Sequence, residues 1–312
     1  MSGFDSSINL VSGGAGFLGS NLIDHLLKKG EEVICVDNYS TGSKVNIEHW
    51  IGHPNFELIT HDIIKPIHIK VNKIWHLACP ASPIHYQYDP IKTSKTCFMG
   101  TLNMLGLAKR NNATMLLASS SEIYGDPQQH PQREVYRGNV NPIGIRSCYD
   151  EGKRISESLC FAYLRQNNTN VKVMRIFNTY GPRMFPNDGR VVSNFILKAL
   201  NNDPLSIYGN GSQTRSFCYV NDLVEGMIKL MDSEQNGPIN FGNPNELTIK
   251  ELAELIIKKI NPELNIKYEE LPEDDPIKRK PDIDLAKQLL GWVPKTSLSE
   301  GMDLTINYFR NL

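Results

Sequence analysis

A tyrosine and a lysine lie four residues apart in the segment SCYDEGKR, residues 147–154. On a helix, Tyr149 and Lys153 would share one face, one turn apart. A phenol with an ordinary pKa of about 10 is a poor base near neutral pH. An ammonium group one turn away favours the phenolate and lowers that pKa. Ser120, in the segment SSSEIYG at 119–125, has a hydroxyl that can hold a substrate alcohol against the same oxygen. This trio predicts a proton acceptor for oxidation of a secondary alcohol, a reaction that needs a hydride acceptor.

A site for the hydride acceptor is predicted near the N-terminus. The apolar run 8–11 leads into SGGAGFLGS, and apolar residues at helical spacing follow over 22–27. Gly13, Gly16 and Gly19 occupy the positions of a G-x-x-G-x-x-G turn. Glycine lets the backbone turn tightly and approach a pyrophosphate, and the following helix N-terminus supplies amide donors. Strand, turn and helix together predict a dinucleotide-binding site.

The next apolar segment, EVICVDN at 32–38, predicts a second buried strand that ends in Asp37. A carboxylate at this strand end suits the ribose diol of an adenosine and would repel a 2′-phosphate. NAD is therefore expected in preference to NADP. The alternative, a glycine-rich turn that binds nothing, is weakened because strand, turn, helix, strand and acid occur together.

Four further apolar runs predict strands of the same sheet, at 56–59, 73–77, 115–119 and 172–176. Helices are expected over about 91–110 and around Tyr149. The segment before the first of these helices contains Pro80, Pro83 and Pro90, so it is predicted to be a loop. It is either a rigid crossover or a substrate contact, since ligands of such folds bind beyond the carboxyl ends of the strands. The alternation predicts an α/β fold with a Rossmann doubly wound parallel sheet.

From Asn178 the strict alternation of strands and helices ends. Helices are expected near 191–201, 222–232 and 248–260 and at the C-terminus, with short strands between them and a charged turn, LPEDDPIKRKPD. We predict a Rossmann domain at 1–177 that also receives about 217–243, and a smaller, partly interleaved α/β substrate domain at 178–216 and 244–312.

Composition excludes several classes of function. The 312 residues, 40% hydrophobic and 21% charged, are ordinary for a globular protein with an ample core. A net charge of -1 offers no general attraction for nucleic acid or an anionic membrane. The six cysteines lack C-x-x-C pairing and the eight histidines lack an H-E-x-x-H arrangement, so we expect reduced thiols and no metal site. Because no apolar run approaches 18 residues and no signal segment is evident, a cytoplasmic protein is expected.

Taken together, the motifs resemble those of the extended short-chain dehydrogenase/reductase family, which includes NAD-dependent epimerases and dehydratases. Within it the resemblance to the UDP-glucuronate decarboxylases, which form UDP-xylose, is close. The resemblance covers about residues 8–310. Its motifs are HLACPASPIHYQYDPIKT, ASSSEIYGDPQQHPQ, GNVNPIG, SCYDEGKR, RIFNTYGPRM, DGRVVSNFI, YGNGSQTRSF and DDPIKRKPDI.

The resemblance implies a role for each of the following positions. Catalytic roles are implied for Ser120, Glu122, Tyr149, Lys153 and Arg279. Contacts with NAD are implied for Gly13, Gly16, Phe17, Leu18, Gly19, Asp37, Asn38, Thr41, Gly42, Asp62, Ile63, Leu77, Lys95, Tyr149, Lys153, Thr179 and Arg190. Contacts with the substrate are implied for Pro83, Tyr149, Asn178, Arg190, Val191, Tyr208, Gln213, Arg215 and Arg279. Arginine suits the diphosphate and the sugar carboxylate because its planar fork pairs with two oxygens. For any single arginine, a structural role is the alternative.

The reaction that the resemblance implies has three steps in one closed site. Tyr149 would take the C4 hydroxyl proton of UDP-glucuronate while hydride leaves C4 for bound NAD. The resulting UDP-4-keto sugar would lose carbon dioxide, because its ketone is beta to the carboxylate. Protonation of C5 and return of hydride to C4 would give UDP-xylose. NAD is thus reduced and reoxidised in each turnover, so tightly held cofactor and a closed site are expected.

Glu122 distinguishes this sequence from its relatives. The similar 4,6-dehydratases have an Asp-Glu pair, in which the acid protonates a leaving hydroxyl, whereas here Ser121 precedes Glu122. The 4-epimerases usually lack the glutamate. Glu122 is therefore expected to handle protons at C5, directly or through water, with Arg279 holding the carboxylate. The alternative is a loop carboxylate that caps a backbone donor.

Other functions remain open at this stage. A 4,6-dehydratase or 4-epimerase would use the same fold, and a non-catalytic NAD-binding regulator would need only the glycine turn and Asp37. Cys97, Arg137 and Ile145 replace an asparagine, a tryptophan and a proline that most relatives have.

The resemblance also implies a homodimer in which helices 91–110 and 149–166 of each subunit form a four-helix bundle. The apolar positions Leu102, Leu105, Leu159 and Phe161 agree with such a bundle, or they face the subunit's own sheet.

Overall fold

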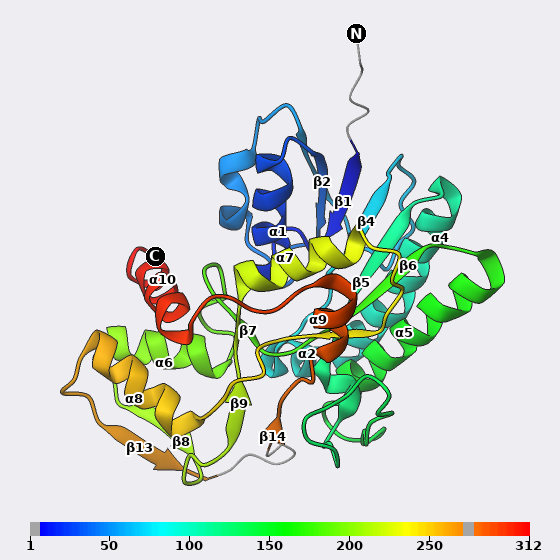
Figure 1. The fold of residues 1–312 in the computed structure, drawn as a ribbon. Helices are drawn as coiled ribbons and strands as arrows, with labels where there is room; N and C mark the ends of the chain where they lie inside the picture. Colours follow the sequence, from blue (N-terminus) through cyan, green and yellow to red (C-terminus); the bar gives the residue numbers. More distant parts are fainter. Residues whose placement is uncertain (1–6, 271–277) are drawn as a thin grey trace.

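A seven-stranded parallel sheet runs through the larger part of the molecule (Figure 1). The computed structural model describes residues 7–270 and 278–312. The strands of the sheet are β1 (Ile8–Ser12), β2 (Glu32–Asp37), β3 (Phe56–Thr60), β4 (Lys73–His76), β5 (Thr114–Ser120), β6 (Val171–Ile176) and β11 (Ile239–Phe241). Their order is β11-β6-β5-β4-β1-β2-β3, and every pair is parallel. The predicted Rossmann doubly wound sheet is confirmed.

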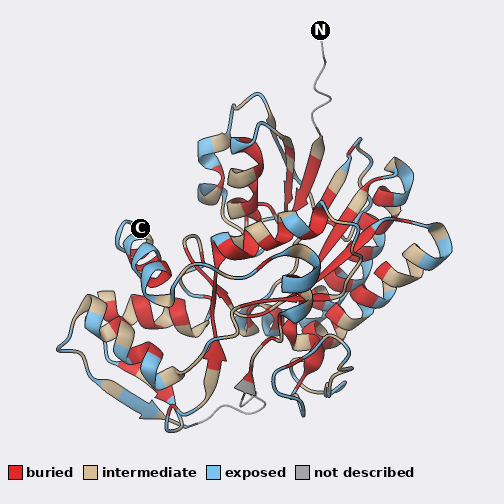
Figure 2. Cartoon of the chain, viewed as in Figure 1, coloured by how far each residue is buried: buried red, intermediate tan, exposed pale blue. Residues whose placement is uncertain are grey.

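The sheet is covered on both faces, as its continuous apolar strands require. Leu10 and Ile74 point into one core, while their neighbours Val11 and Trp75 point into the other. Side chains alternate between the two faces of a strand, so each strand contributes to both cores. Figure 2 shows the resulting continuous layer of buried residues along the strands.

Two layers of helices provide this cover. Helices α1 (Phe17–Lys28) and α7 (Val220–Met231) pack together and contribute to the core that holds Val11. Helices α4 (Thr101–Asn111) and α5 (Ser147–Asn167) contribute to the core that holds Leu10. Helices α1 and α4 bury mainly apolar residues, which is the pattern of a surface helix. Helix α5 differs, because its buried face also carries Asp150, Lys153 and Glu157.

The segment that leads into α4 differs from its prediction. It was expected to be a loop up to residue 90, but Pro83–Tyr88 forms helix α2, with Pro83 in the first turn, where its missing N–H is not needed. Helix α3 (Pro90–Lys95) follows, capped by the Asp89 side chain on the amide of Lys92 at 2.9 Å. A π-helical turn, Thr96–Gly100, then joins α3 to α4. Pro83 and Pro90 therefore start helices.

The second half of the chain forms a smaller set of layers beside the sheet (Figure 1). Helices α6 (Val191–Leu200) and α8 (Ile249–Ile260) pack together. The strands are β7 (Thr179–Tyr180) with β10 (Cys218–Tyr219), β8 (Leu205–Tyr208) with β13 (Ile266–Glu269), and β9 (Thr214–Ser216) between β12 (Glu246–Thr248) and β14 (Lys278–Arg279). Short 3₁₀ turns occur at Lys44–Asn46, Glu48–Trp50 and Ser121–Tyr124.

The C-terminal helix expected from the sequence is in fact two helices, α9 (Asp284–Leu290) and α10 (Leu298–Arg310). Gly291 ends α9 in the left-handed conformation, where glycine carries no steric penalty. Most of the predicted charged turn, residues 271–277, lies outside the described residues. None of the described helices combines the length and the apolar content needed to cross a membrane.

Candidate active site

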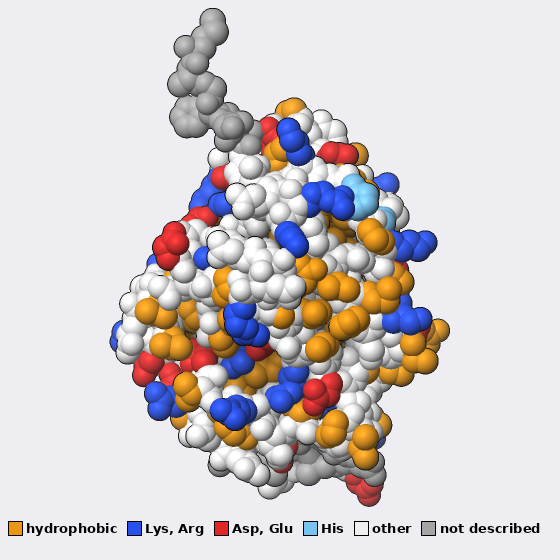
Figure 3. All heavy atoms as spheres, turned by 90° about the vertical axis from the view of Figure 1, so that its right-hand side faces the viewer, with side chains coloured by type: hydrophobic (Ala, Val, Ile, Leu, Met, Phe, Trp, Pro, Cys, Tyr) orange, Lys and Arg blue, Asp and Glu red, His pale blue; other side chains and the backbone are white. Residues whose placement is uncertain are grey.

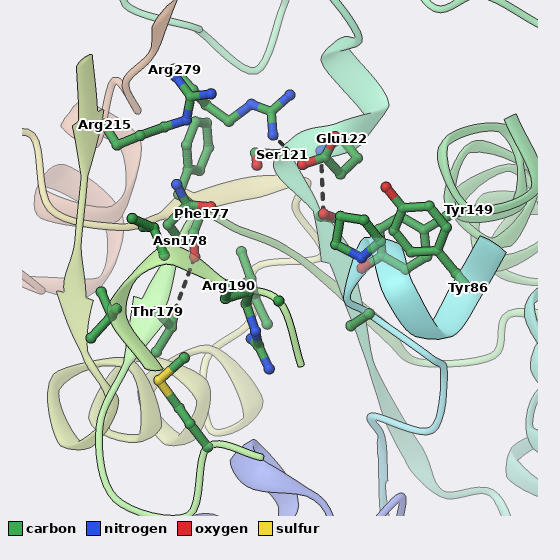
Figure 4. Close-up of a pocket in the computed structure, with 18 of the residues that line it drawn as sticks. Tyr86, Ser121, Glu122, Tyr149, Phe177, Asn178, Thr179, Arg190, Arg215 and Arg279 are labelled. Carbon is green, nitrogen blue, oxygen red and sulfur yellow. Dashed lines mark hydrogen bonds and ion pairs between the residues drawn. The ribbon is translucent and has the colours of Figure 1, made fainter. Parts of the chain in front are cut away.

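Several strands and helices end around a cavity of about 500 Å³ at the carboxyl edge of the sheet (Figure 4). Strand β5 delivers Ser120 to this cavity, α5 delivers Tyr149 and Lys153, and the small strands β9 and β14 deliver Arg215 and Arg279. Figure 4 shows Tyr149 on one side of the cavity and Arg215 on the other. The predicted site residues, which are far apart in the sequence, thus line one cavity.

A second cavity, of about 370 Å³, adjoins the first, and Phe17, Leu18, Leu77 and Arg190 line both. It contains most of the positions at which a cofactor contact was predicted. These are Gly13, Gly16, Phe17, Leu18, Gly19, Asp37, Asn38, Thr41, Gly42, Asp62, Ile63, Leu77 and Arg190. Thr179, Tyr149 and Lys153 line the first cavity.

Lys95 is the predicted cofactor residue that the structure does not bring to either cavity. Its side chain is exposed near the end of α3. Lys92, one turn earlier, lines the second cavity and forms an ion pair with Asp62. Sequence position alone could not determine which lysine of this helix faces inward.

The glycine turn fits a dinucleotide closely. Gly13 has a positive φ of 74°, and a Cβ on it would lie 2.8 Å from the backbone of Ala78. A Cβ on Gly19 would lie 2.2 Å from the carbonyl oxygen of Gly13. Gly16, the N-cap of α1, has no side chain to cap the first amides of that helix. The turn therefore leaves amide donors and the positive end of a helix dipole at the cavity, which suits a pyrophosphate.

Asp37 is already held in position at the end of β2. Its two carboxylate oxygens accept hydrogen bonds from the amides of Ala15 (2.9 Å) and Tyr39 (2.8 Å). Burial raises the pKa of Asp37, and these backbone donors work in the opposite direction. Because each oxygen keeps a further lone pair, the carboxylate can accept hydrogen bonds from a ribose diol without leaving its partners. The glycine turn and Asp37 together therefore fit NAD.

Tyr149 and Lys153 share one face of α5, as predicted. The Lys153 ammonium donates a 2.8 Å hydrogen bond to the carbonyl of Ala118 and lies 5.6 Å from the centre of the Tyr149 ring. The ring of Tyr149 stacks on Tyr86, with centres 5.0 Å apart and planes inclined by 7°. The predicted base is thus fixed between an aromatic neighbour and a cation.

The prediction that the lysine would lower the pKa of Tyr149 is wrong. Burial raises the pKa of Tyr149 well above its ordinary value, and the nearby Cys79 thiol adds to the rise. Hydrogen bonding to Ser120 works in the opposite direction. The physical reason is burial, which withholds from the phenolate the water that would stabilise its charge.

A buried ion pair anchors the same helix to the sheet. Arg175 on β6 binds both carboxylate oxygens of Glu157 on α5, at 3.0 and 2.8 Å, and Ser119 donates to one of them at 2.5 Å. A bidentate pair with a further donor fixes position as well as adding binding energy. The helix that carries Tyr149 is therefore locked against the end of β5.

Glu122 lies at the centre of the site between two arginines (Figure 4 labels it and Arg279). Arg146 donates to one of its oxygens at 2.6 Å, and Arg279 pairs with the other. Burial alone would raise the pKa of Glu122, but the two guanidinium groups outweigh burial and hold that pKa below its ordinary value. Glu122 is therefore a carboxylate and not a carboxylic acid. The alternative of a simple backbone cap does not describe it.

All the predicted substrate positions line the first cavity: Pro83, Tyr149, Asn178, Arg190, Val191, Tyr208, Gln213, Arg215 and Arg279. Arg190 reaches from the start of α6 toward the junction of the two cavities, where it pairs with Asp188 at 2.5 Å and stacks over Phe17. Three of these predicted positions are arginines, and Arg146 also lines the cavity, which indicates an anionic ligand.

Sequence reasoning missed three residues of this site. Arg146 immediately precedes α5, three positions before Tyr149, and its helical spacing was the available signal. Tyr86, which stacks on Tyr149, was hidden in the segment predicted to be a loop. Asp150 is buried beside Tyr149, and its Oδ1 has no hydrogen-bond partner among the described protein groups.

The chain matches the family model described as GDP-mannose 4,6 dehydratase over residues 10–305. UDP-glucuronic acid decarboxylase 6 of Arabidopsis thaliana is 59% identical over 302 residues, which cover 96% of this chain and 88% of the relative. UDP-glucuronic acid decarboxylase 1 of Xenopus tropicalis is 58% identical over 301 residues, which cover 96% of this chain and 72% of the relative.

The chain belongs to the UDP-glucuronic acid decarboxylase family. Its fold also matches solved structures of other nucleotide-sugar enzymes. The UDP-glucuronic acid 4-epimerase of Bacillus cereus, in complex with UDP-glucuronic acid and NAD, superposes with a TM-score of 0.86 at 26% identity, covering 97% of this chain and 99% of that one. The predicted family resemblance is confirmed. In this member of the decarboxylase family, Ser121 and the doubly paired Glu122 lie next to Tyr149 around one cavity.

The unpartnered carboxyl of Asp150 makes a prediction about stability. Burial, with the Glu122 carboxylate nearby, raises the pKa of Asp150 from 3.8 to about 7. Between these two values the native state holds a proton that the unfolded state has lost. Ionisation of Asp150 in the unfolded state therefore stabilises that state, and the free energy of unfolding falls as pH rises toward 7. Asp150→Asn removes this cost, on the order of 2–4 kcal/mol.

The measurement is denaturant unfolding of the wild type and Asp150→Asn at pH 5 and pH 8. The variant should gain stability relative to the wild type on going from pH 5 to pH 8. Glu151→Gln is the matched control, because Glu151 is the next residue on α5 but is half-exposed and paired with Arg154. The same stability difference at both pH values for Asp150→Asn would contradict the raised pKa.

Proposed function

We propose that this chain is an NAD-dependent UDP-glucuronate decarboxylase that converts UDP-glucuronate to UDP-xylose and carbon dioxide through a UDP-4-keto intermediate. Family membership supports the reaction, with decarboxylase relatives 58–59% identical over 96% of the chain. One observation in the site carries the assignment: an ionised Glu122, preceded by Ser121, stands between Arg146 and Arg279. No acid stands at position 121 to protonate a leaving hydroxyl, as a dehydratase requires.

Tyr149 is the group placed to accept the proton of the C4 hydroxyl. Its phenol hydrogen bonds to Ser120, so a sugar hydroxyl that contacts both oxygens is oriented for proton transfer. When bound, NAD supplies the hydride acceptor and later returns the hydride, and its positively charged ring favours the Tyr149 phenolate. The proton taken up by Tyr149 stays on the phenol and returns to the C4 oxygen when the ketone is reduced.

The arginines bind the carboxylate of the sugar without holding it too strongly. A carboxylate loses its negative charge as carbon dioxide leaves, so strong pairing in the ground state would slow the reaction. Glu122 neutralises part of the charge of Arg279 and Arg146 and thereby weakens that pairing. The electron pair of the broken C5–C6 bond then delocalises into the C4 ketone as an enolate.

Glu122 is also placed to manage the proton that C5 must receive. Because its pKa is lowered, it acts as a carboxylate that accepts a hydrogen bond from water and orients that water. The water donates the proton to C5, and the hydroxide that remains takes up a proton from the solvent. Glu122 therefore acts through a water molecule and does not itself donate the proton as an acid.

The test is incubation of the purified protein with UDP-glucuronate, without added NAD, followed by proton NMR. Formation of UDP-xylose with no accumulation of NADH is the expected result, since NAD is held and regenerated. No reaction even after NAD is supplied would reject the assignment. UDP-galacturonate as the product would show a 4-epimerase, and a 4-keto-6-deoxy product from UDP-glucose or dTDP-glucose would show a 4,6-dehydratase.

Replacement of Tyr149 by phenylalanine tests the proposed base. Loss of one phenol oxygen should lower kcat by at least about 10²-fold, because general base catalysis is removed. The NAD content of the purified variant should stay that of the wild type, since the glycine turn and Asp37 are untouched. Tyr163→Phe, near the other end of α5, is the matched control. A Tyr149→Phe variant with wild-type kcat would remove Tyr149 from this role.

The division of labour within the chain is also a proposal. Residues 1–177, together with about 217–243, hold NAD, and residues 178–216 and 244–312 hold the nucleotide sugar. Two features support it: β11, from the second half, pairs with β6 of the main sheet, and the arginines at 215 and 279 come from β9 and β14.

We place the protein in the cytoplasm because all six cysteines are free thiols, the usual state in reducing compartments.

For the oligomeric state we propose a homodimer through a four-helix bundle of α3–α4 and α5. Figure 3, which faces the side of the molecule with α4 and α5, shows apolar side chains gathered on that surface. Ile91 is 69% exposed, Phe98 43% and Leu102 37%. Leu105 is fully buried in the subunit's own core, and Leu159 and Phe161 are partly buried against it. The bundle would therefore use the exposed set, with a second copy of this chain covering it.

Leu102→Glu should convert the dimer to a monomer, because a charge would be buried in an apolar interface. The measurement is size-exclusion chromatography with light scattering on wild type and variant. Leu304→Glu is the control, since Leu304 is 45% exposed on the distant helix α10. A wild type that is monomeric at all concentrations would reject the bundle.

A further inference from the structure

Two cysteine sulfurs lie 3.3 Å apart beside the active site. Cys79 follows strand β4, in the segment that packs on the glycine turn. Cys97 lies in the π-helical turn before α4. Neither thiol has a part in the proposed decarboxylation. The pair thus needs a separate explanation.

The two thiols differ in their access to small molecules. Cys79 is half-buried and lines both cavities, so a small solute in either cavity can reach its sulfur. Cys97 is 2% exposed and lies behind Cys79, where it is reached only through that neighbour. An oxidant that enters the site therefore meets Cys79 first.

The two thiols also differ in reactivity. The hydrogen bond between the two sulfurs lowers the pKa of Cys79, with a smaller contribution from the Lys153 ammonium; burial opposes both. Since the thiolate is the reactive form, Cys79 is the nucleophile of the pair. By contrast, burial raises the pKa of Cys35, Cys160 and Cys218, which makes those thiols inert.

We propose that Cys79 and Cys97 are a redox modification site, at which a peroxide forms a reversible disulfide that inactivates the enzyme. The Cys79 thiolate attacks one peroxide oxygen; an S–O bond forms, the O–O bond breaks, and the leaving hydroxide takes a proton to become water. Cys97 then attacks the resulting sulfenic acid; an S–S bond forms, the S–O bond breaks, and a second water leaves. Overall, two thiols and hydrogen peroxide give a disulfide and two waters, with two electrons passing from sulfur to the peroxide.

The disulfide would disturb the catalytic helix. The sulfurs must approach from 3.3 Å to about 2.05 Å, so one or both segments must move. Cys97 packs tightly on Gly152, where an added Cβ would lie 2.8 Å from its sulfur, and its carbonyl accepts a 2.9 Å hydrogen bond from Ser156. Gly152 directly precedes Lys153 on α5. Displacement of about 1 Å at such a site is enough to cost about 10²-fold in rate.

In the experiment, the 312-residue protein is treated with hydrogen peroxide, the remaining thiols are alkylated, and cross-linked peptides are identified by mass spectrometry. We expect a Cys79–Cys97 peptide that lacks two hydrogen atoms and disappears on treatment with dithiothreitol. Cys97→Ser should abolish that peptide and leave Cys79 as a sulfenic or more oxidised acid. Cys148→Ser should retain it; Cys148 is the nearby control thiol, half-buried and bonded to the carbonyl of Tyr86 at 3.4 Å. Cys97→Ala replaces Cys97→Ser where the serine variant fails to fold.

Turnover is measured on the same oxidised samples. Turnover should fall in proportion to the cross-linked fraction, and it should be at least about tenfold lower when all of the protein is cross-linked. It should recover with dithiothreitol. Oxidation confined to other thiols, or a Cys79–Cys148 cross-link in place of Cys79–Cys97, would overturn the site. A cross-linked protein with full turnover would overturn the inactivation. Because cross-linking is read from mass, failure of the decarboxylase assignment is distinguishable from failure of the disulfide.

Discussion

The carboxylate of Glu122 connects three parts of the chain that are distant in sequence. It follows β5, one of its arginine partners precedes α5, and the other comes from β14, 157 residues away. A buried charge is tolerated only when it is paired, and removal of one partner leaves the other uncompensated. The site is therefore complete only when the main sheet, the helix of Tyr149 and the small C-terminal strand are all in place. Catalytic geometry and tertiary structure depend on the same ion pairs.

Much of the fold could be predicted because its signals are local. The apolar runs gave the first six strands of the main sheet, since a buried parallel strand needs both faces apolar. The pairing of Tyr149 with Lys153 needed only the period of one helix. The glycine turn was predictable because the close backbone contacts at that bend admit only glycine, which leaves a motif in the sequence. Asp37 was predictable because it ends the next apolar run.

What could not be predicted depends on contacts between distant segments or on single rotamers. Nothing in the sequence shows that Arg146 meets Glu122, or that Lys92 and not Lys95 turns inward. The short helix at Pro83–Tyr88 was missed because proline was interpreted as a sign of a loop, although it also occurs in the first turn of a helix. The raised pKa of Tyr149 also depends on three-dimensional surroundings, since it follows from burial of the phenol and from the nearby Cys79. Local pattern thus predicts the framework, and the electrostatics of the site follow only from the assembled fold.

The position of β11 at the edge of the main sheet has a consequence for biosynthesis. Strand β6 ends at Ile176, but its partner does not begin until Ile239, after much of the smaller layer has been translated. During synthesis, β6 is therefore an open edge whose amide and carbonyl groups are available to other strands. The chain leaves the ribosome N-terminus first, so this edge stays open until α6 and α7 have been translated and β11 follows. Nascent chains that end between Ile176 and Ile239 therefore expose an edge with which a strand of another chain can pair.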